Sequence, residues 1–183
     1  MIAAIVVLTV SQAALGQKLP NSIRGYKVHH AKAIISSIDA DAATDPKSDL
    51  AIKLKPPSVV EITFSGAVFE VDAEFTAGHN GKVDMITFHD FEANGIPFKI
   101  EDSVTPFSFK KNRTAAMPHP ARVSVSLTSI PRAVYKQISD NPSDLKVTGR
   151  AFIFGRFKKF GMTFKRVVPI TIDIKIKNPL HTP

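Results

Sequence analysis

The sequence predicts an all-β fold, a two-sheet antiparallel β-sandwich of the immunoglobulin or fibronectin-III kind. Short runs of alternating apolar and polar residues recur along the chain, and Gly, Pro or Asn-Gly turns close them at the spacing of about 8–12 residues that is typical of sandwiches. Thirteen Phe, with no Trp and two Tyr, supply large apolar side chains that need no hydrogen-bond partner. Hydrophobic residues make up 44% of the 183 residues, which favours one folded globular domain over a disordered chain.

The first half of the chain is divided into short segments by prolines and glycines. We expect strands over residues 26–35, 50–54, 60–64, 69–75, 83–91 and 96–100. Pro56-Pro57 ends the second of these strands, because proline cannot donate to a sheet ladder. Asn94-Gly95 joins the last two and predicts a tight hairpin, because both residues tolerate a positive φ.

The second half of the chain continues the β pattern around one short helix. We expect strands over residues 107–109, 123–127, 147–157, 162–168 and 170–176. The helix is expected over 131–139, with Pro131 in its first turn and Asn141-Pro142 after its end. The isoleucines of the last strand alternate with polar residues, so they share one face. Of these, we expect the central Ile172 and Ile174 to be the most deeply buried.

The N-terminus has the features of a signal peptide, residues 1–16. Ile2–Val10 is an apolar run of signal-peptide length, and small residues precede a cleavage point between Gly16 and Gln17. The run is shorter than the roughly 20 residues that span a bilayer. No Lys or Arg precedes it, and a buried N-terminal strand is the alternative interpretation. We therefore expect residues 17–183 to form a single secreted or periplasmic domain, without disulfides because the chain has no Cys.

Charge is distributed unevenly along the chain, whose formal net charge is +8. Residues 1–102 carry nine Lys and Arg against thirteen Asp and Glu, a net of −4. Residues 103–183 carry fifteen against three, a net of +12. This asymmetry predicts an anionic partner or surface for the C-terminal half. No motif in the sequence indicates a nucleic acid as that partner.

A basic hairpin is the most distinctive segment of the C-terminal half. Between Arg150 and Arg166 six cations alternate with five Phe and no acid intervenes. If Lys158 and Gly161 flank the turn, Phe157 faces Met162 and Phe160 lies at an exposed tip. The residues predicted to bind an anionic lipid surface, a polyanionic glycan or an anionic protein are Arg150, Arg156, Lys158, Lys159, Phe160, Lys165 and Arg166. The alternative is a structural hairpin whose charges deter edge pairing.

Other polar residues do not predict a catalytic or metal site. Glu70, Asp72 and Glu74 share a strand face, but Ca²⁺ also needs loop oxygens, so we expect a solvated face paired with neighbouring cations. The six His have no partners at ligand spacing, and no nucleophile-elbow, phosphate-loop or zinc-protease motif occurs. We therefore expect no enzyme activity, no metal and no cofactor. Asn112-Arg113-Thr114 has the form of a glycosylation acceptor.

From Val59 to Ile176, about two-thirds of the chain, the order of elements resembles the late embryogenesis abundant group 2 domain of water stress and hypersensitive response. Four segments carry the resemblance: Phe91-Glu92-Ala93-Asn94-Gly95-Ile96-Pro97-Phe98, Met117-Pro118-His119-Pro120, Val123-Ser124-Val125-Ser126-Leu127 and Val147-Thr148-Gly149-Arg150-Ala151-Phe152. The first is similar to the family's Asn-Gly hairpin, whereas the family's early Asn-Pro is not found at the matching place. The resemblance implies a two-sheet sandwich with a short helix, no catalytic residues, and a link to desiccation and stress tolerance.

Together these features predict a non-catalytic exported β-sandwich that protects against stress or associates with an anionic surface. The alternative is a specific protein- or glycan-binding module that uses the loops at the ends of the sandwich. Salt distinguishes the two, because exposed electrostatic attraction is screened over a Debye length of about 8 Å at physiological ionic strength.

Overall fold

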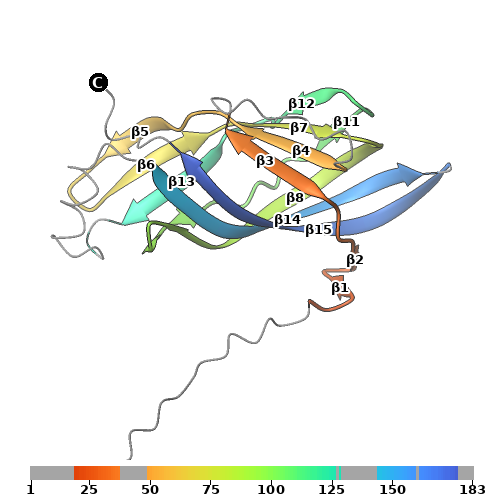
Figure 1. The fold of residues 1–183 in the computed structure, drawn as a ribbon, viewed down its shortest axis with the longest axis horizontal. Coiled ribbons are helices and arrows are strands. Elements are labelled where there is room, and N and C mark those ends of the chain that lie inside the picture. The colour runs from red at the N-terminus through yellow and green to blue at the C-terminus, as the bar shows by residue number, and fades with distance from the viewer. Residues whose placement is uncertain (1–18, 38–48, 127, 129–143, 160, 177–183) are drawn as a thin grey trace, which may run out of the picture.

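The fold is all-β, as the sequence predicts. The computed structural model describes residues 19–37, 49–126, 128, 144–159 and 161–176, and every regular element in them is a strand (Figure 1). The helix expected over 131–139 and the signal peptide expected over 1–16 lie outside the described residues.

The larger layer is a seven-stranded sheet with the order β1-β2-β15-β14-β8-β11, in which β9 also pairs with β8. Its strands are β1 (Ser22–Ile23), β2 (Tyr26–Val28), β8 (Asn80–Ala93), β9 (Ile96–Pro97), β11 (Phe107–Phe109), β14 (Leu145–Lys159) and β15 (Met162–Ile176). The β8–β9 connection confirms the predicted hairpin. Asn94 and Gly95 have φ of 49° and 80°, and Ala93 lies opposite Ile96.

Two four-stranded sheets form the rest, with the orders β12-β7-β4-β3 and β10-β13-β6-β5. Their strands are β3 (Ala33–Ser37), β4 (Leu50–Leu54), β5 (Ser58–Ile62), β6 (Gly66–Val71), β7 (Ala73–Ala77), β10 (Lys99–Ile100), β12 (Thr114–Ala116) and β13 (Ala121–Ser126). The expectation of two purely antiparallel sheets is therefore wrong in detail. The described residues form three sheets, and the β2–β15 and β3–β4 pairs are parallel.

Prolines explain why there are three sheets. Prolines separate β4 from β5 (Pro56-Pro57) and β12 from β13 (Pro118 and Pro120) along the chain. A proline cannot donate a hydrogen bond to the sheet ladder. Between them, β6 and β7 are separated only by Asp72. Two hydrogen bonds continue across the breaks, from the Lys55 amide to the Asp72 carbonyl (2.9 Å) and from the Met117 amide to the Ala73 carbonyl (3.0 Å). The two small sheets thus continue each other end to end.

The core lies between the seven-stranded sheet and β12-β7-β4-β3. Phe75 and Ile52 from the small sheet pack in one cluster with Val83, Ile86 and Ile153 from the large one. The buried Ala73, Phe75 and Ala77 of β7 alternate as predicted. Val83 and Ile86 of β8 are three residues apart, because the register of β8 against β14 shifts between Val83 and Met85.

The last strand is longer than predicted, and this changes which residue is central. Residues 162–176 form one strand through Pro169, because β2 pairs with β15 only at Arg166 and Val167 and so leaves the β15 edge free at the proline. Ile170 is therefore near the middle of β15 and is 5% exposed, whereas Ile172 and Ile174 are half-buried. The expected order of burial along this face was wrong.

Candidate functional site

The basic hairpin exists, but with a tighter turn than expected. Lys159 lies opposite Met162 and Phe157 opposite Phe164, so only residues 160 and 161 connect the strands. Gly161 has a φ of 75° and lies inside the turn rather than beside it, which moves every cross-strand pair by two positions. Phe160, the predicted tip, lies outside the described residues.

The outer face of the hairpin carries Arg150, Arg156, Lys158 and Lys165, and the two arginines are engaged with acids. The Arg156 Nε lies 3.1 and 3.0 Å from the two carboxylate oxygens of Asp84, and its Nη2 lies 2.7 Å from Oδ1. Arg150 forms an ion pair with Asp90. Both acids come from β8, the neighbouring strand. The sequence therefore overestimates the free charge of the hairpin.

The N-terminal arm, which we define as β1, β2 and the turn between them (residues 22–28), holds the Arg156–Asp84 pair in place. The Tyr26 hydroxyl donates to Asp84 Oδ2 at 3.1 Å, and the Tyr26 ring packs edge-on against Phe154, with 5.3 Å between centroids. Arg24 also lies over Phe154, so that this side chain on the outer sheet face is only 1% exposed. The arm thus covers the middle of the outer face. Lys158 stays exposed beyond it, and the exposed Lys165 lies over the Tyr26 ring, with its Nζ 6.0 Å from the ring centre.

Hydrogen bonding explains the acidity of Asp84. The Arg156 guanidinium, and after it the Tyr26 hydroxyl, hold the pKa of Asp84 below its usual value, while burial opposes them. Burial, followed by the hydrogen bond to Asp84, raises the pKa of Tyr26. Asp84 therefore stays ionised at neutral pH and offsets the charge of Arg156.

A second group of cations, which the sequence analysis missed, lies beside the hairpin tip. Lys110, Lys111 and Arg113 form the exposed turn between β11 and β12. The Lys111 amide donates to the side-chain oxygen of Asn80 at 2.8 Å, and Asn80 lies opposite Lys158 in the sheet. Figure 1 shows the β11–β12 turn and the β14–β15 tip at the same end of the molecule. The strand order β14-β8-β11 brings the two turns together, and no spacing of residues in the sequence predicts this order.

We call this cluster the basic end. It is defined by six exposed cations: Lys82, Lys110, Lys111, Arg113, Lys158 and Lys165. Two acids among the described residues lie near it. Asp84 forms an ion pair with Arg156, and the Asp49 carboxylate accepts a hydrogen bond from the Lys32 amide at 3.2 Å. Arg166, also predicted to bind anions, is half-buried on the opposite face of β15, with its guanidinium 5.4 Å from the Phe164 ring centre.

The row of carboxylates has the solvated, paired character that was expected. Lys55 Nζ lies 3.8 Å from both Asp72 and Glu74. Glu70 lies opposite Arg122 of β13. Within the described ranges no group of three or more His, Cys, Asp or Glu is placed to hold a metal ion. In the same residues, no helix is long and apolar enough to cross a membrane.

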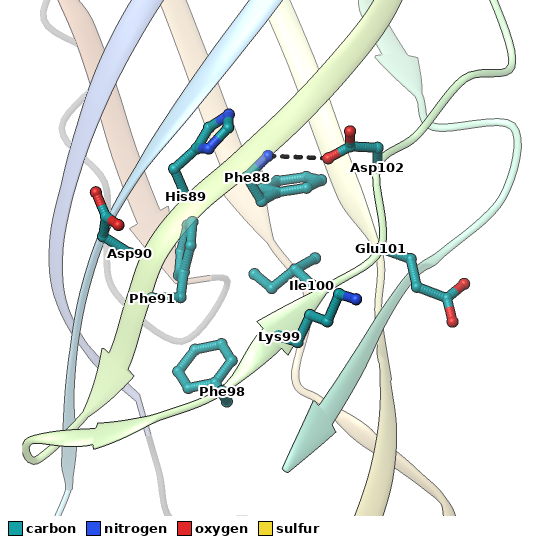
Figure 2. A pocket seen from close by; sticks show the side chains of 9 residues that line it. All are labelled: Phe88, His89, Asp90, Phe91, Phe98, Lys99, Ile100, Glu101 and Asp102. Carbon is teal, nitrogen blue, oxygen red and sulfur yellow. Dashed lines mark hydrogen bonds between the residues drawn. The ribbon is translucent and has the colours of Figure 1, made fainter. Parts of the chain in front are cut away.

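A hollow of about 480 Å³ opens where the chain crosses from β9 in the large sheet to β10 in a small one. Figure 2 shows Phe88, Phe91 and Phe98 around it, and the ring centroids are 5.9 Å apart for the first pair and 5.7 Å for the second. Asp102 accepts a hydrogen bond from the Phe88 amide at 3.2 Å, and Glu101 points away from the hollow. The hollow is therefore an aromatic cleft with few free polar groups.

We compared the chain with family models, curated proteins and solved structures. No family model and no curated protein matches the chain. A crystal structure of a protein from Archaeoglobus fulgidus is similar, with a TM-score of 0.36 and 13% sequence identity, over 69% of this chain and 95% of that chain.

Proposed function

We propose that this is a non-catalytic domain that attaches to an anionic surface through the basic end. The observation that supports the proposal is the juxtaposition of two exposed cationic turns, β11–β12 and β14–β15, by hydrogen bonding through Asn80. The basic end as a whole has six exposed cations, and the nearby acid Asp84 already has a partner in Arg156. A cluster of exposed cations at one end of a domain attracts anionic lipid head groups or sulfated glycans without any specific pocket.

The strength expected of such a site follows from its charge. Each Lys or Arg near an anionic membrane contributes on the order of 1 kcal/mol, and the attraction decays within a Debye length. Six cations acting together are therefore sufficient for measurable attachment at low salt. Exposed Met162, next to the turn, is the described apolar side chain that is best placed to enter a lipid surface.

The proposal includes an extracytoplasmic location and a protective role at an envelope surface. It is supported by the signal-peptide features of residues 1–16 and by the sequence segments between Val59 and Ile176 that resemble the late embryogenesis abundant group 2 domain. Mass spectrometry of protein from its native host tests the location. The expected mature chain begins at Gln17, and soluble protein that retains Met1 contradicts export.

Vesicle co-sedimentation and heparin chromatography test the binding function. Wild type is expected to bind phosphatidylserine-containing vesicles and heparin at low salt, and to release both as salt rises. Lys111→Glu with Lys158→Glu is expected to weaken both interactions at least five-fold. The matched control is Arg122→Glu with Lys175→Glu, two exposed cations away from the basic end, which should change binding less than two-fold.

The same assays distinguish lipid from glycan. Met162→Ser is expected to weaken vesicle binding and to leave heparin binding unchanged if lipid is the natural surface, because heparin offers no apolar phase. Failure of wild type to bind either ligand at low salt contradicts the proposed function.

The aromatic cleft supports a second candidate, recognition of a neutral glycan. Phe88, Phe91 and Phe98 offer ring faces to the apolar side of a sugar, and Lys99 and Asp102 are polar groups at the opening. Binding of neutral oligosaccharides that is insensitive to salt and lost in Phe98→Ala would favour this candidate over the basic end.

A further inference from the structure

Exposed apolar side chains gather on one short stretch of the chain. Of the six large hydrophobic residues that are exposed in the described parts of the chain, four lie between residues 59 and 64: Val59, Val60, Ile62 and Phe64. Ile62 is 61% exposed, and Phe64 at the β5–β6 turn is fully exposed. Single exposed apolar residues are normal, but a contiguous group marks an interaction surface.

These residues belong to a strand with an open edge. β5 pairs with β6 on one side, and no described strand pairs with its other side. Every residue of β5 is exposed. Such an edge presents backbone donors and acceptors to which an additional strand can bind. The β5–β6 turn lies at the opposite end of the molecule from the basic end (Figure 1).

The register shows that an added strand would meet apolar groups on one face and Glu61 on the other. Val59 lies opposite the buried Phe69, so it is on the core side of the sheet, and Ile62 lies opposite the buried Ala67 on the same side. Val60 lies at a bulge between these positions. On the outer side of the sheet, Glu61 lies opposite Val68 of β6.

Charge changes sign across this small sheet. In the order β10-β13-β6-β5, Lys99 and Arg122 occupy the two strands farthest from the open edge, and Glu70 and Glu61 the two nearest to it. A strand added beside β5 would therefore place its own side chains next to Glu61. A Lys or Arg there is favourable, because opposite charges on neighbouring strands attract and like charges repel.

We propose that the open edge of β5 accepts an extended segment of a partner protein, which adds a strand and carries apolar residues together with a Lys or Arg beside Glu61. A second copy of this chain fits less well, because antiparallel pairing of two β5 edges would bring two Glu61 carboxylates close together. A lipid surface fits less well too, because Glu61 would enter it beside Ile62 and Phe64. This inference is independent of the function proposed for the basic end.

The test uses an acetylated and amidated heptapeptide in which Lys and Val alternate, titrated into ¹⁵N-labelled protein. We expect saturable binding with amide shifts concentrated in residues 58–70. A peptide of the same sequence with alternate amides N-methylated cannot complete a ladder and should bind at least ten-fold more weakly. Equal binding of the two peptides overturns the proposal, because it would indicate charge attraction alone.

Variants identify the edge and separate this site from the basic end. Ile62→Lys should weaken peptide binding at least five-fold while heparin binding stays unchanged, because Ile62 is already exposed and lies far from the basic end. Val104→Lys, at an apolar residue that is 70% exposed on another segment, is the matched control and should leave peptide binding unchanged. Three outcomes overturn the proposal: no peptide binding by wild type, vesicle binding that depends on Phe64, or a wild-type dimer that Ile62→Lys dissociates.

Discussion

At the scale of single residues, the outer face of the large sheet depends on an acid that stays charged. Asp84 is 12% exposed, and it accepts hydrogen bonds from Arg156 and from the Tyr26 hydroxyl. Because these bonds lower its pKa in the folded state, the unfolded chain binds more protons between that lowered pKa and the ordinary value of 3.8. Stability gained from Asp84 is complete above this window and is lost as pH falls through it.

The first prediction follows from this acid. Asp84→Asn is expected to lower the urea midpoint at pH 7, and the difference from wild type should narrow as pH falls below about 3.8. Asp173→Asn is the control, since Asp173 is more than half exposed and meets Lys146 at 3.3 Å. Parallel pH profiles for wild type and Asp84→Asn would show that Asp84 does not couple folding to pH.

A second prediction concerns the core residues of the last strand. Ile170→Ala is expected to cost about 2–5 kcal/mol of unfolding free energy, because it removes a fully packed side chain and leaves a cavity. Ile174→Ala should cost less, because Ile174 is half-buried near the end of β15. Denaturant melts of the two variants measure which of them loses more unfolding free energy. A larger loss of unfolding free energy for Ile174→Ala would contradict the observed burial.

At the scale of elements, β14 approaches β8 closely where its register shifts. The shift lies between Phe154 and Gly155, and a Cβ added to Gly155 would lie 2.7 Å from the Lys82 carbonyl oxygen. Backbone cannot move aside as a flexible side chain can. The glycine therefore keeps β14 against β8 at the point where both strands enter the basic end.

The third prediction tests this close approach. Gly155→Ala is expected to destabilise the fold by about 1–3 kcal/mol through overpacking. Gly78→Ala is the matched control, because an added Cβ there would meet nothing within 4 Å and the change should stay within about 0.5 kcal/mol. Equal stability of the two variants in thermal melts would mean that the strands separate readily at Gly155.

The elements also show what the sequence could and could not predict. Alternation located most strands, and Asn94-Gly95 predicted its hairpin because a two-residue turn is determined by local φ preferences. The two strands expected over 162–168 and 170–176 are one strand through Pro169, because whether a proline fits a strand depends on which edge has a partner. The pairing of Arg150 and Arg156 with acids of β8, some 60 and 72 residues away in the chain, could not be predicted, because it depends on the long-range strand order.

At the scale of the whole molecule, the two ends differ in chemistry. The end with the β14–β15 tip gathers six exposed cations, and the end with the β5–β6 turn gathers exposed apolar side chains beside Glu61. The charge asymmetry of the sequence predicted a basic surface. The cations that gather at the basic end differ from the predicted set: Lys110, Lys111 and Arg113 join it through Asn80, while Arg150 and Arg156 are engaged with acids.

The most direct test of the central claim is a titration of ¹⁵N-labelled protein with a short heparin oligosaccharide, followed by amide chemical shifts at low and high salt. Binding at the basic end predicts shifts in both 110–113 and 158–166, with little change in 58–70, and their loss at high salt. Shifts confined to the hairpin alone would show that the two turns do not act together. Shifts centred on residues 88–102 that persist at high salt would contradict the account and assign binding to the aromatic cleft.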